Sequence, residues 1–232
     1  MTFEEKCAAL RKMSLFATCT DIELESIASD FSYKAFKKHT LTIESEAARH
    51  RLYLIANNGR MKVSVTNPVT AEDLTVYMLS FGDVFNVMTL IDDEKDYLTA
   101  HALDDIEIFY SSMELARHWI QKCPCFSRSL LKHLSKRLRQ VQDFNIQRTF
   151  YSIEMRLAVL IFQNICGSDA KVNLLNDLPH SELAKMLGTT RAVVNRNLQK
   201  LKKDGLIDIR RKNILVEDYE RLWALIKSHQ IS

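Results

Sequence analysis

Residues 180–216 constrain the fold of this chain more than any other segment. An apolar-patterned helix is followed by the turn Leu187-Gly188-Thr189-Thr190, and the next helix is expected over Arg191–Lys203. Gly188 can adopt the left-handed conformation that ends a helix, and Thr190 can cap the helix that follows. A basic turn at 210–213 then lies between two short β-rich runs. This order predicts a winged helix-turn-helix.

The second predicted helix has two unlike faces. Val194, Leu198 and Leu201 are spaced to point inward. Residues 180–216 contain nine Lys or Arg against three acids, a formal charge of +6. We therefore expect the segment to bind double-stranded DNA rather than to be an ordinary solvated helix. The outer face is made of Arg191, Ala192, Asn195, Arg196 and Gln199.

The predicted DNA contacts are of two kinds. Arg191, in the first turn of the second helix, is expected to pair with guanine, and Asn195 and Arg196 are the next candidates to read bases. Gln199 completes this reading face. Contacts to the DNA backbone are expected from Thr189, Thr190, Lys200, Arg210, Arg211 and Lys212.

Charge is distributed unevenly along the 232 residues. Residues 1–110 carry a net charge of −7 and residues 111–232 a net charge of +10. This asymmetry predicts a sensing module joined to one that meets a polyanion. No apolar run approaches the roughly 18 residues of a membrane span, and the start lacks the pattern of a signal peptide, so we expect a cytoplasmic protein.

The first half reads as two short helices within residues 1–30, followed by several short β-rich runs. Strands at this spacing predict an antiparallel roll or barrel. Gly59 and Gly82 stand where tight turns would require a positive φ. The β-rich runs are 41–43, 52–55, 61–65, 74–79 and 106–110.

A long helix is predicted from Pro124 to about Phe150, after a short helix at 112–120. Leu130 and Phe144 widen its apolar face, which indicates packing on the roll as well. The seam predicts a parallel homodimer whose reading helices lie one DNA turn apart, about 34 Å, and match a palindromic operator. The seam residues, at alternating steps of three and four, are Leu131, Leu134, Leu138, Val141 and Asn145.

Five cysteines form an odd set without paired zinc-type spacing. This favours reduced, mostly buried thiols over a disulfide framework. A disulfide between Cys123 and Cys125, across one residue at a helix start, would be strained, so we expect these thiols to be dispensable. A thiol redox sensor remains an alternative.

Three motifs are shared with a known family: Leu52-Tyr53-Leu54-Ile55 leading to Gly59, Phe81-Gly82-Asp83-Val84-Phe85, and Leu187-Gly188-Thr189-Thr190-Arg191 with Arg196. The chain resembles the cyclic-AMP receptor protein/FNR (Crp/Fnr) family of bacterial transcription regulators over nearly its full length. The resemblance implies an α+β fold and a homodimeric regulator that acts with RNA polymerase. The implied parts are a cyclic-nucleotide-binding-like antiparallel β-roll with N-terminal helices at 1–123, a dimerisation helix at 124–150, and a winged helix-turn-helix at 151–232.

The family's effector and reading motifs are incomplete in this chain. Val87 stands where the family has a ribose-binding glutamate, and Tyr97 where it has a phosphate-binding arginine, so cyclic AMP is not expected to bind. Ala192 replaces the glutamate that accepts from cytosine, which argues against the usual half-site, and Asn195 becomes an adenine reader. The expected effector pocket consists of Tyr77, Phe85, Asn86, Met88 and Tyr97.

The sequence offers few ligands for a metal cofactor. Cys7 and Cys19 alone cannot complete the N-terminal iron–sulfur site of the oxygen-sensing branch. The family's haem-based sensor is similar at Gly82–Phe85 and at Cys123-Pro124, but Met88 stands in place of its ligating histidine. A haem-based sensor is kept as an alternative.

No sequence motif indicates an enzyme. Gly-x-Ser-x-Gly, the P-loop and the dinucleotide fingerprint are missing, and the seven histidines have no metal-binding spacing. The cluster Asp92-Asp93-Glu94 reads as a solvated loop. The open alternatives are a ligand-gated repressor or activator, an effector-independent DNA-binding protein, and a haem or thiol sensor.

Overall fold

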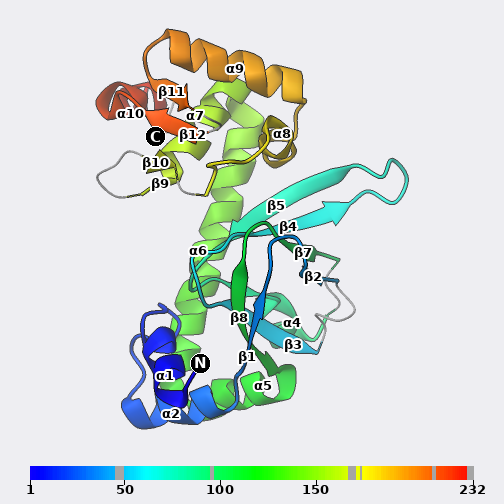
Figure 1. Cartoon of the computed structure of the whole chain (residues 1–232), viewed down its shortest axis with the longest axis vertical. Coiled ribbons are helices and arrows are strands. Elements are labelled where there is room, and N and C mark those ends of the chain that lie inside the picture. Colours follow the sequence, from blue (N-terminus) through cyan, green and yellow to red (C-terminus); the bar gives the residue numbers. More distant parts are fainter. Residues whose placement is uncertain (45–49, 95–96, 167–170, 173, 211–212, 229–232) are drawn as a thin grey trace. The chain divides into compact units, whose positions relative to one another are not determined.

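The computed structural model describes residues 1–44, 50–94, 97–166, 171–172, 174–210 and 213–228 (Figure 1). The chain divides into two compact units. Met1–Ala71 and Val76–Arg139 form the first, and Glu72–Thr75 and Gln140–Ser232 form the second. No helix within the described ranges is long and apolar enough to cross a membrane.

The chain begins with two short helices, as predicted: α1 (Phe3–Arg11) and α2 (Asp21–Ser29). Each starts with a capping box, in which a threonine and the glutamate three residues later exchange hydrogen bonds. In α2, the Glu23 N–H donates to Thr20 Oγ1 at 3.3 Å and the Thr20 N–H donates to Glu23 Oε2 at 2.8 Å. These caps explain why nine residues suffice for each helix.

The next region is a β-roll of two four-stranded sheets, which confirms the predicted fold class (Figure 1). The pairings β1–β8, β3–β8, β3–β6, β2–β7 and β4–β7 are antiparallel. One sheet has the order β1 (Ser32–Phe36), β8 (Ile106–Ser112), β3 (Arg51–Ile55), β6 (Val84–Phe85). The other has the order β2 (Thr42–Ile43), β7 (Thr99–Ala102), β4 (Met61–Thr66), β5 (Asp73–Leu79).

Two apolar clusters stabilise the first unit. One lies inside the roll and is built from Ile55, Met61, Val63, Leu79 and neighbouring residues of both sheets, all close to fully buried. The other joins α1 and α2 to the outer side of the roll and to the helices that follow it. The roll interior is therefore filled by its own side chains.

The two glycines predicted to need a positive φ differ. Gly82 has φ +77°, as predicted. Gly59 does not fall in that region, so this prediction is wrong. A Cβ at Gly59 would lie 2.5 Å from the Asp105 carbonyl oxygen, and close approach of the backbone is the physical reason for this glycine.

The helix α4 (Val87–Asp92) lies between β6 and β7, and two helices follow the roll: α5 (Met113–Lys122) and α6 (Pro124–Phe150). The 27 residues of α6 confirm the predicted long helix beginning at Pro124. Phe126, Ser129 and Leu130 are its buried residues. One side of the first half of α6 therefore packs on its own roll.

The second unit contains the helix-turn-helix and a third sheet of order β11-β12-β10-β9. The first helix of this unit ends at Gln163 rather than near Cys166 as predicted, because Cys166 pairs with Lys171 in the sheet. Its elements are α7 (Ile153–Gln163), β9 (Ile165–Cys166), β10 (Lys171–Val172), α8 (His180–Leu187), α9 (Arg191–Lys203), β11 (Ile207–Arg210), β12 (Asn213–Val216) and α10 (Tyr219–Lys227).

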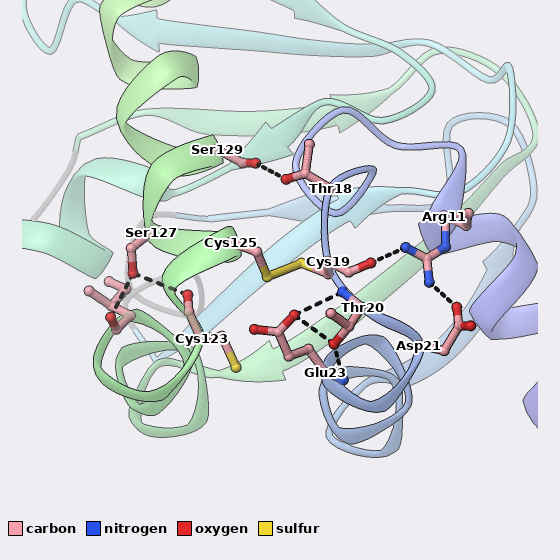
Figure 2. The surroundings of a disulfide bond; sticks show 11 residues. Arg11, Thr18, Cys19, Thr20, Asp21, Glu23, Cys123, Cys125, Ser127 and Ser129 are labelled. Carbon is pink, nitrogen blue, oxygen red and sulfur yellow. Dashed lines mark hydrogen bonds and ion pairs between the residues drawn. A yellow bond between two sulfur atoms is a disulfide. The ribbon is translucent and has the colours of Figure 1, made fainter.

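The structure overturns the expectation of reduced thiols. Cys19 and Cys125 form a disulfide with their Cα atoms 5.2 Å apart, although 106 residues separate them in sequence (Figure 2). Cys7 and Cys123 are free. The pairing could not be read from cysteine spacing, because packing of the N-terminal helices against α6 brings the two residues together.

Candidate nucleic-acid interface

The turn between α8 and α9 has the geometry that the sequence predicts. Gly188 is left-handed, with φ 59° and ψ 47°, and its N–H donates to the Ala184 carbonyl. Thr190 caps α9, since its hydroxyl accepts from the Val193 N–H at 3.4 Å. The Arg156 guanidinium on α7 donates to the Leu187 carbonyl and satisfies the end of α8. Both helices are thus fixed at the turn.

α9 is buried on one side and open on the other. Val194, Leu198 and Leu201 are fully buried, as predicted, and anchor the helix in the second unit. The opposite side is exposed and presents Arg191, Ala192, Asn195, Arg196, Gln199 and Lys200. This side can approach a ligand without any rearrangement of the core.

Arg191 and Arg196 carry the unpaired positive charge of this side. Neither is paired with a carboxylate of the described residues. Arg191 is also the first residue of α9, where free backbone N–H groups and the helix dipole favour an anion. Both guanidinium groups are therefore available for phosphate or guanine.

Three nearby cations are held in ion pairs. Lys200 pairs with Glu154 of α7, Lys202 lies 2.7 Å from Asp208, and Arg210 lies 2.6 Å from the same carboxylate. Hydrogen bonds from Lys202 and then Arg210 hold the pKa of Asp208 far below its ordinary value. The formal +6 of residues 180–216 already counts Asp208 but not Glu154, so the pairing of Lys200 with Glu154 lowers the charge that is free to meet DNA.

The wing is the β11–β12 hairpin, in which Arg210 pairs with Asn213. Arg211 and Lys212, two of the predicted backbone contacts, lie outside the described residues. Thr189 is half-buried and Thr190 is exposed beside the α9 N-terminus. The predicted site is thus assembled on α9, with Arg210 on the neighbouring hairpin strand.

Three positioning residues were missed by the sequence reasoning. Arg156 holds the α8 carboxyl end, Glu154 holds Lys200, and Asp208 holds Lys202 and Arg210. Glu154 and Arg156 are 46 and 31 residues from their partners. No local pattern reports such pairs, although a carboxylate inside a strongly basic segment is a signal for the third.

The chain is similar to known proteins in its helix-turn-helix and along most of its length. A Crp-like helix-turn-helix domain is recognised over residues 155–225, which include α8, α9 and the wing strands. The CRP-like cAMP-activated global transcriptional regulator of Mycobacterium tuberculosis is 27% identical over 188 residues, covering 79% of this chain and 83% of that protein. Residues 155–225 thus form a Crp-like helix-turn-helix domain, and the chain is similar to Crp/Fnr-type transcription regulators over most of its length.

Other known proteins are similar to this chain over most of their length. The global nitrogen regulator of Synechocystis sp. is 27% identical over 174 residues, 72% of this chain and 76% of the relative. FixK2 from Bradyrhizobium japonicum has a TM-score of 0.72 at 16% identity, covering 84% of this chain and 96% of that structure. A CooA variant from Carboxydothermus hydrogenoformans has a TM-score of 0.70 at 22% identity, covering 85% and 88%. These structures share the fold of the chain described here.

The residues of the predicted effector pocket have different surroundings. Phe85 and Asn86 are buried, and the Asn86 amide donates to the Arg51 carbonyl at 3.2 Å. Tyr77 lies beneath the Arg137 guanidinium, 4.7 Å from its ring centre. Met88 and Tyr97 are 56% and 76% exposed, respectively. The five side chains do not line one enclosed space.

The predicted dimer seam is largely open in the single chain. Leu131, Leu138 and Val141 are 66%, 61% and 56% exposed, and Asn145 is also exposed. Leu134 is half-buried against the core shared by α1, α2 and α6. Leu134 thus packs largely on its own chain, while Leu131, Leu138 and Val141 form an exposed apolar strip on α6.

Proposed function

We propose that this chain is a homodimeric, sequence-specific regulator that binds palindromic DNA through α9. The observation that carries the proposal is the exposed side of α9, where Arg191 and Arg196 are unpaired and lie beside Asn195 and Gln199. These side chains can form hydrogen bonds with base edges in the major groove. As a bacterial regulator of its family, the protein would act on RNA polymerase in the cytoplasm.

Reading and anchoring fall to different residues in this proposal. Arg191 pairs with guanine, and Asn195 and Arg196 read further bases. Thr189, Thr190, Lys200 and the wing contact the DNA backbone. The ion pairs support this division, because Lys200 and Arg210 must share their charge with Glu154 and Asp208, whereas Arg191 has no carboxylate partner among the described residues.

Dimerisation is proposed along the exposed apolar strip of α6. Leu131, Leu138 and Val141 recur at the steps of a coiled-coil seam, and such residues are seldom left open on a long helix. Regulators of this family are dimers. A two-fold dimer repeats the α9 surface, and the operator must then consist of two half-sites about 34 Å apart.

We also propose that the effector is not a cyclic nucleotide. Val87 offers no acceptor for a ribose hydroxyl, and Tyr97 offers no charge for a phosphate. Calorimetric titration with cyclic AMP is expected to give no saturable heat. Micromolar one-to-one binding would contradict this part of the proposal.

Selection from a randomised duplex DNA library tests the main proposal. The wild-type protein should enrich a two-fold symmetric sequence whose half-site centres are about 10–10.5 base pairs apart or a multiple of this. Enrichment of no sequence, or of an asymmetric single site, would contradict it. Light scattering on the same sample should give the mass of two chains.

A further inference from the structure

Four of the five cysteines gather in one core. Cys19 and Cys123 are buried members of the cluster that joins α1, α2 and α6, and Cys7 and Cys125 pack against it. Cys19 and Cys125 are joined by the disulfide (Figure 2), while Cys7 and Cys123 remain thiols. The core therefore contains one disulfide-bonded pair of cysteines and two free thiols.

The disulfide holds the first turns of α6 against the segment between α1 and α2. Two weaker contacts act at the same place: the Phe16 and Phe126 rings stack at 5.7 Å, and the Thr18 and Ser129 hydroxyls lie 3.3 Å apart. Ser129 is one helical turn beyond Cys125, so both face the same segment (Figure 2). The disulfide is the one covalent link among these three contacts.

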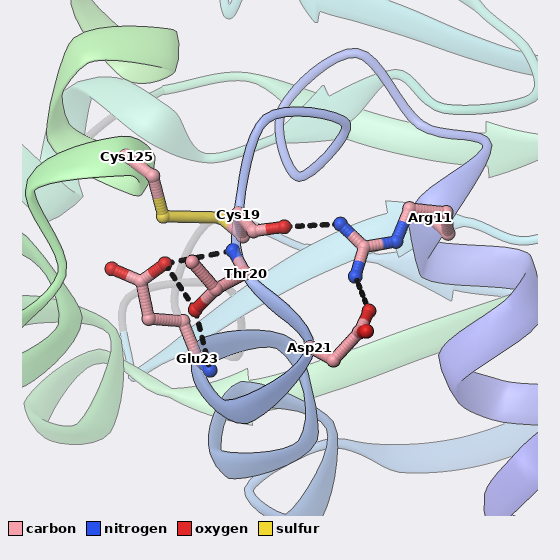
Figure 3. Close-up of polar contacts among 6 residues, drawn as sticks. All are labelled: Arg11, Cys19, Thr20, Asp21, Glu23 and Cys125. Atoms are coloured by element: carbon pink, nitrogen blue, oxygen red, sulfur yellow. Dashed lines mark hydrogen bonds and ion pairs between the residues drawn. A yellow bond between two sulfur atoms is a disulfide. The ribbon is translucent and has the colours of Figure 1, made fainter.

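Cys19 is fixed independently of the disulfide (Figure 3). The Arg11 guanidinium donates to the Cys19 carbonyl and to the Asp21 carboxylate, and the Thr20–Glu23 capping box follows directly. These contacts lie on the N-terminal segment alone. Breaking the disulfide would therefore loosen the first turn of α6 more than it would move Cys19, and Cys19 would stay in place to form the bond again.

We propose that Cys19 and Cys125 form a thiol–disulfide switch that sets the affinity of the regulator for DNA. The inference rests on the proposed function, because the affected element is the helix that carries the proposed dimer strip. Leu131 is six residues from Cys125, about 9 Å along the helix. The closed disulfide holds this end of the strip, and reduction frees it, so the oxidised form binds palindromic DNA more tightly.

The chemistry is an exchange with a cellular dithiol of the thioredoxin class. Its thiolate attacks the sulfur of Cys125, which is half-buried, whereas Cys19 is 4% exposed. The Cys125–Cys19 bond breaks, a mixed disulfide forms, and Cys19 leaves as a thiolate and takes a proton. The second thiol of the reductant then displaces Cys125, which also takes a proton. Two electrons pass to the protein disulfide, and the reductant becomes a disulfide.

The two remaining thiols do not compete for this exchange. Burial, reinforced by Glu25, raises the pKa of Cys7. Burial, reinforced by Glu23 and Asp30, raises the pKa of Cys123. Since thiolates rather than thiols react, both are less reactive than an ordinary cysteine thiol at neutral pH.

The test compares DNA affinity in oxidised and reduced glutathione buffers. The probe is the palindrome selected by the oxidised wild-type protein, and alkylation followed by peptide mass spectrometry reports the state of each cysteine. Reduction of the wild type should weaken binding about tenfold, a typical coupling between two sites. Cys19→Ser and Cys125→Ser should bind at the reduced level in both buffers. Cys123→Ser, the matched control, should respond as the wild type does.

Thermal unfolding provides a readout independent of DNA. The oxidised wild type should melt above the reduced form, and Cys19→Ser should show no difference between buffers. If Cys125→Ser fails to fold, the comparison of the reduced wild type with Cys19→Ser still tests the switch, because neither protein has a substitution in α6. Equal DNA affinity in both buffers, or a Cys19→Ser variant that still switches, overturns the switch alone. Loss of DNA binding in both states refutes the proposed function and the switch with it.

Discussion

At the scale of single residues, the contribution of a cation to DNA binding depends on whether a carboxylate already pairs with it. Arg191→Ala should cost about 1–3 kcal/mol of DNA binding and relax the base preference at one position in each half-site. Lys200→Ala should cost less and leave the preference unchanged, because Glu154 already pairs with that ammonium. Fluorescence anisotropy over randomised half-sites measures both, with Lys12→Ala as a distant cationic control. An Arg191→Ala protein that keeps its base preference would reverse the assignment.

Two glycines should respond to alanine for different reasons. Gly188→Ala meets no atom within 4 Å but keeps a left-handed backbone, so we expect a loss of about 1–2 kcal/mol of folding stability. Gly59→Ala has no such φ but places a Cβ 2.5 Å from the Asp105 oxygen, and the turn must shift. Urea unfolding monitored separately in each unit should assign Gly188→Ala to the second unit and Gly59→Ala to the first. Both losses in one unit would contradict this explanation.

The Arg60–Asp104 pair predicts a pH dependence. Arg60 Nε lies 2.6 Å from Asp104, and this hydrogen bond is the largest cause of the lowered pKa of that carboxyl. A carboxyl with a lowered folded-state pKa stabilises the fold above its unfolded value, about 3.9, and the effect is lost as pH falls further. Asp104→Asn should therefore unfold more easily at pH 7 and lose less stability on acidification to pH 3. Asp92→Asn, at an exposed carboxylate, should follow the wild type; an unchanged slope in Asp104→Asn would refute the assignment.

At the scale of elements, α6 has two roles that substitutions can separate. Leu138→Glu with Val141→Glu places charges on the exposed strip, and we expect monomers, loss of operator binding and a nearly unchanged melting temperature. Leu134→Ala removes a side chain that packs on the core of the same chain, so it should cost about 2 kcal/mol of stability and leave the dimer intact. Sedimentation velocity and thermal unfolding distinguish the two. A double variant that is still dimeric would exclude this strip.

Elements whose signals are local could be predicted from the sequence. The turn at Gly188, the cap at Thr190 and the buried stripe of α9 depend on residues within a few positions of one another. β1, β6 and β7 were not among the predicted β-rich runs, because such short strands are defined mainly by their partners in the sheet. Leu134 was assigned to the dimer seam because α6 uses apolar residues both to pack on its own roll and to form the exposed strip. The spacing of apolar residues alone cannot distinguish these two sets.

At the scale of the whole molecule, the sequence predicted the order of the parts but not the long-range pairs. The β-roll, the long helix and the winged helix-turn-helix follow from pattern and resemblance. The Lys200–Glu154 pair and the Cys19–Cys125 disulfide join positions 46 and 106 residues apart. Both arise only when packing brings distant segments together. The same limit explains why the effector residues named from an aligned cassette, Met88 and Tyr97 among them, lie exposed.

The Cys19–Cys125 disulfide also determines the covalent topology of the protein. Residues 19–125 form a closed loop that contains every strand of the β-roll, while α7 to α10 lie outside it. A protease that cuts once within the loop leaves a single covalent particle, which divides into two only when a reductant is added. A cut between Phe150 and Ile153, before α7 begins, separates the winged helix-turn-helix from the loop at once. Within residues 19–125, cleavage of a peptide bond therefore leaves the mass of the protein unchanged until the disulfide is reduced. Between α6 and α7, cleavage lowers the mass immediately.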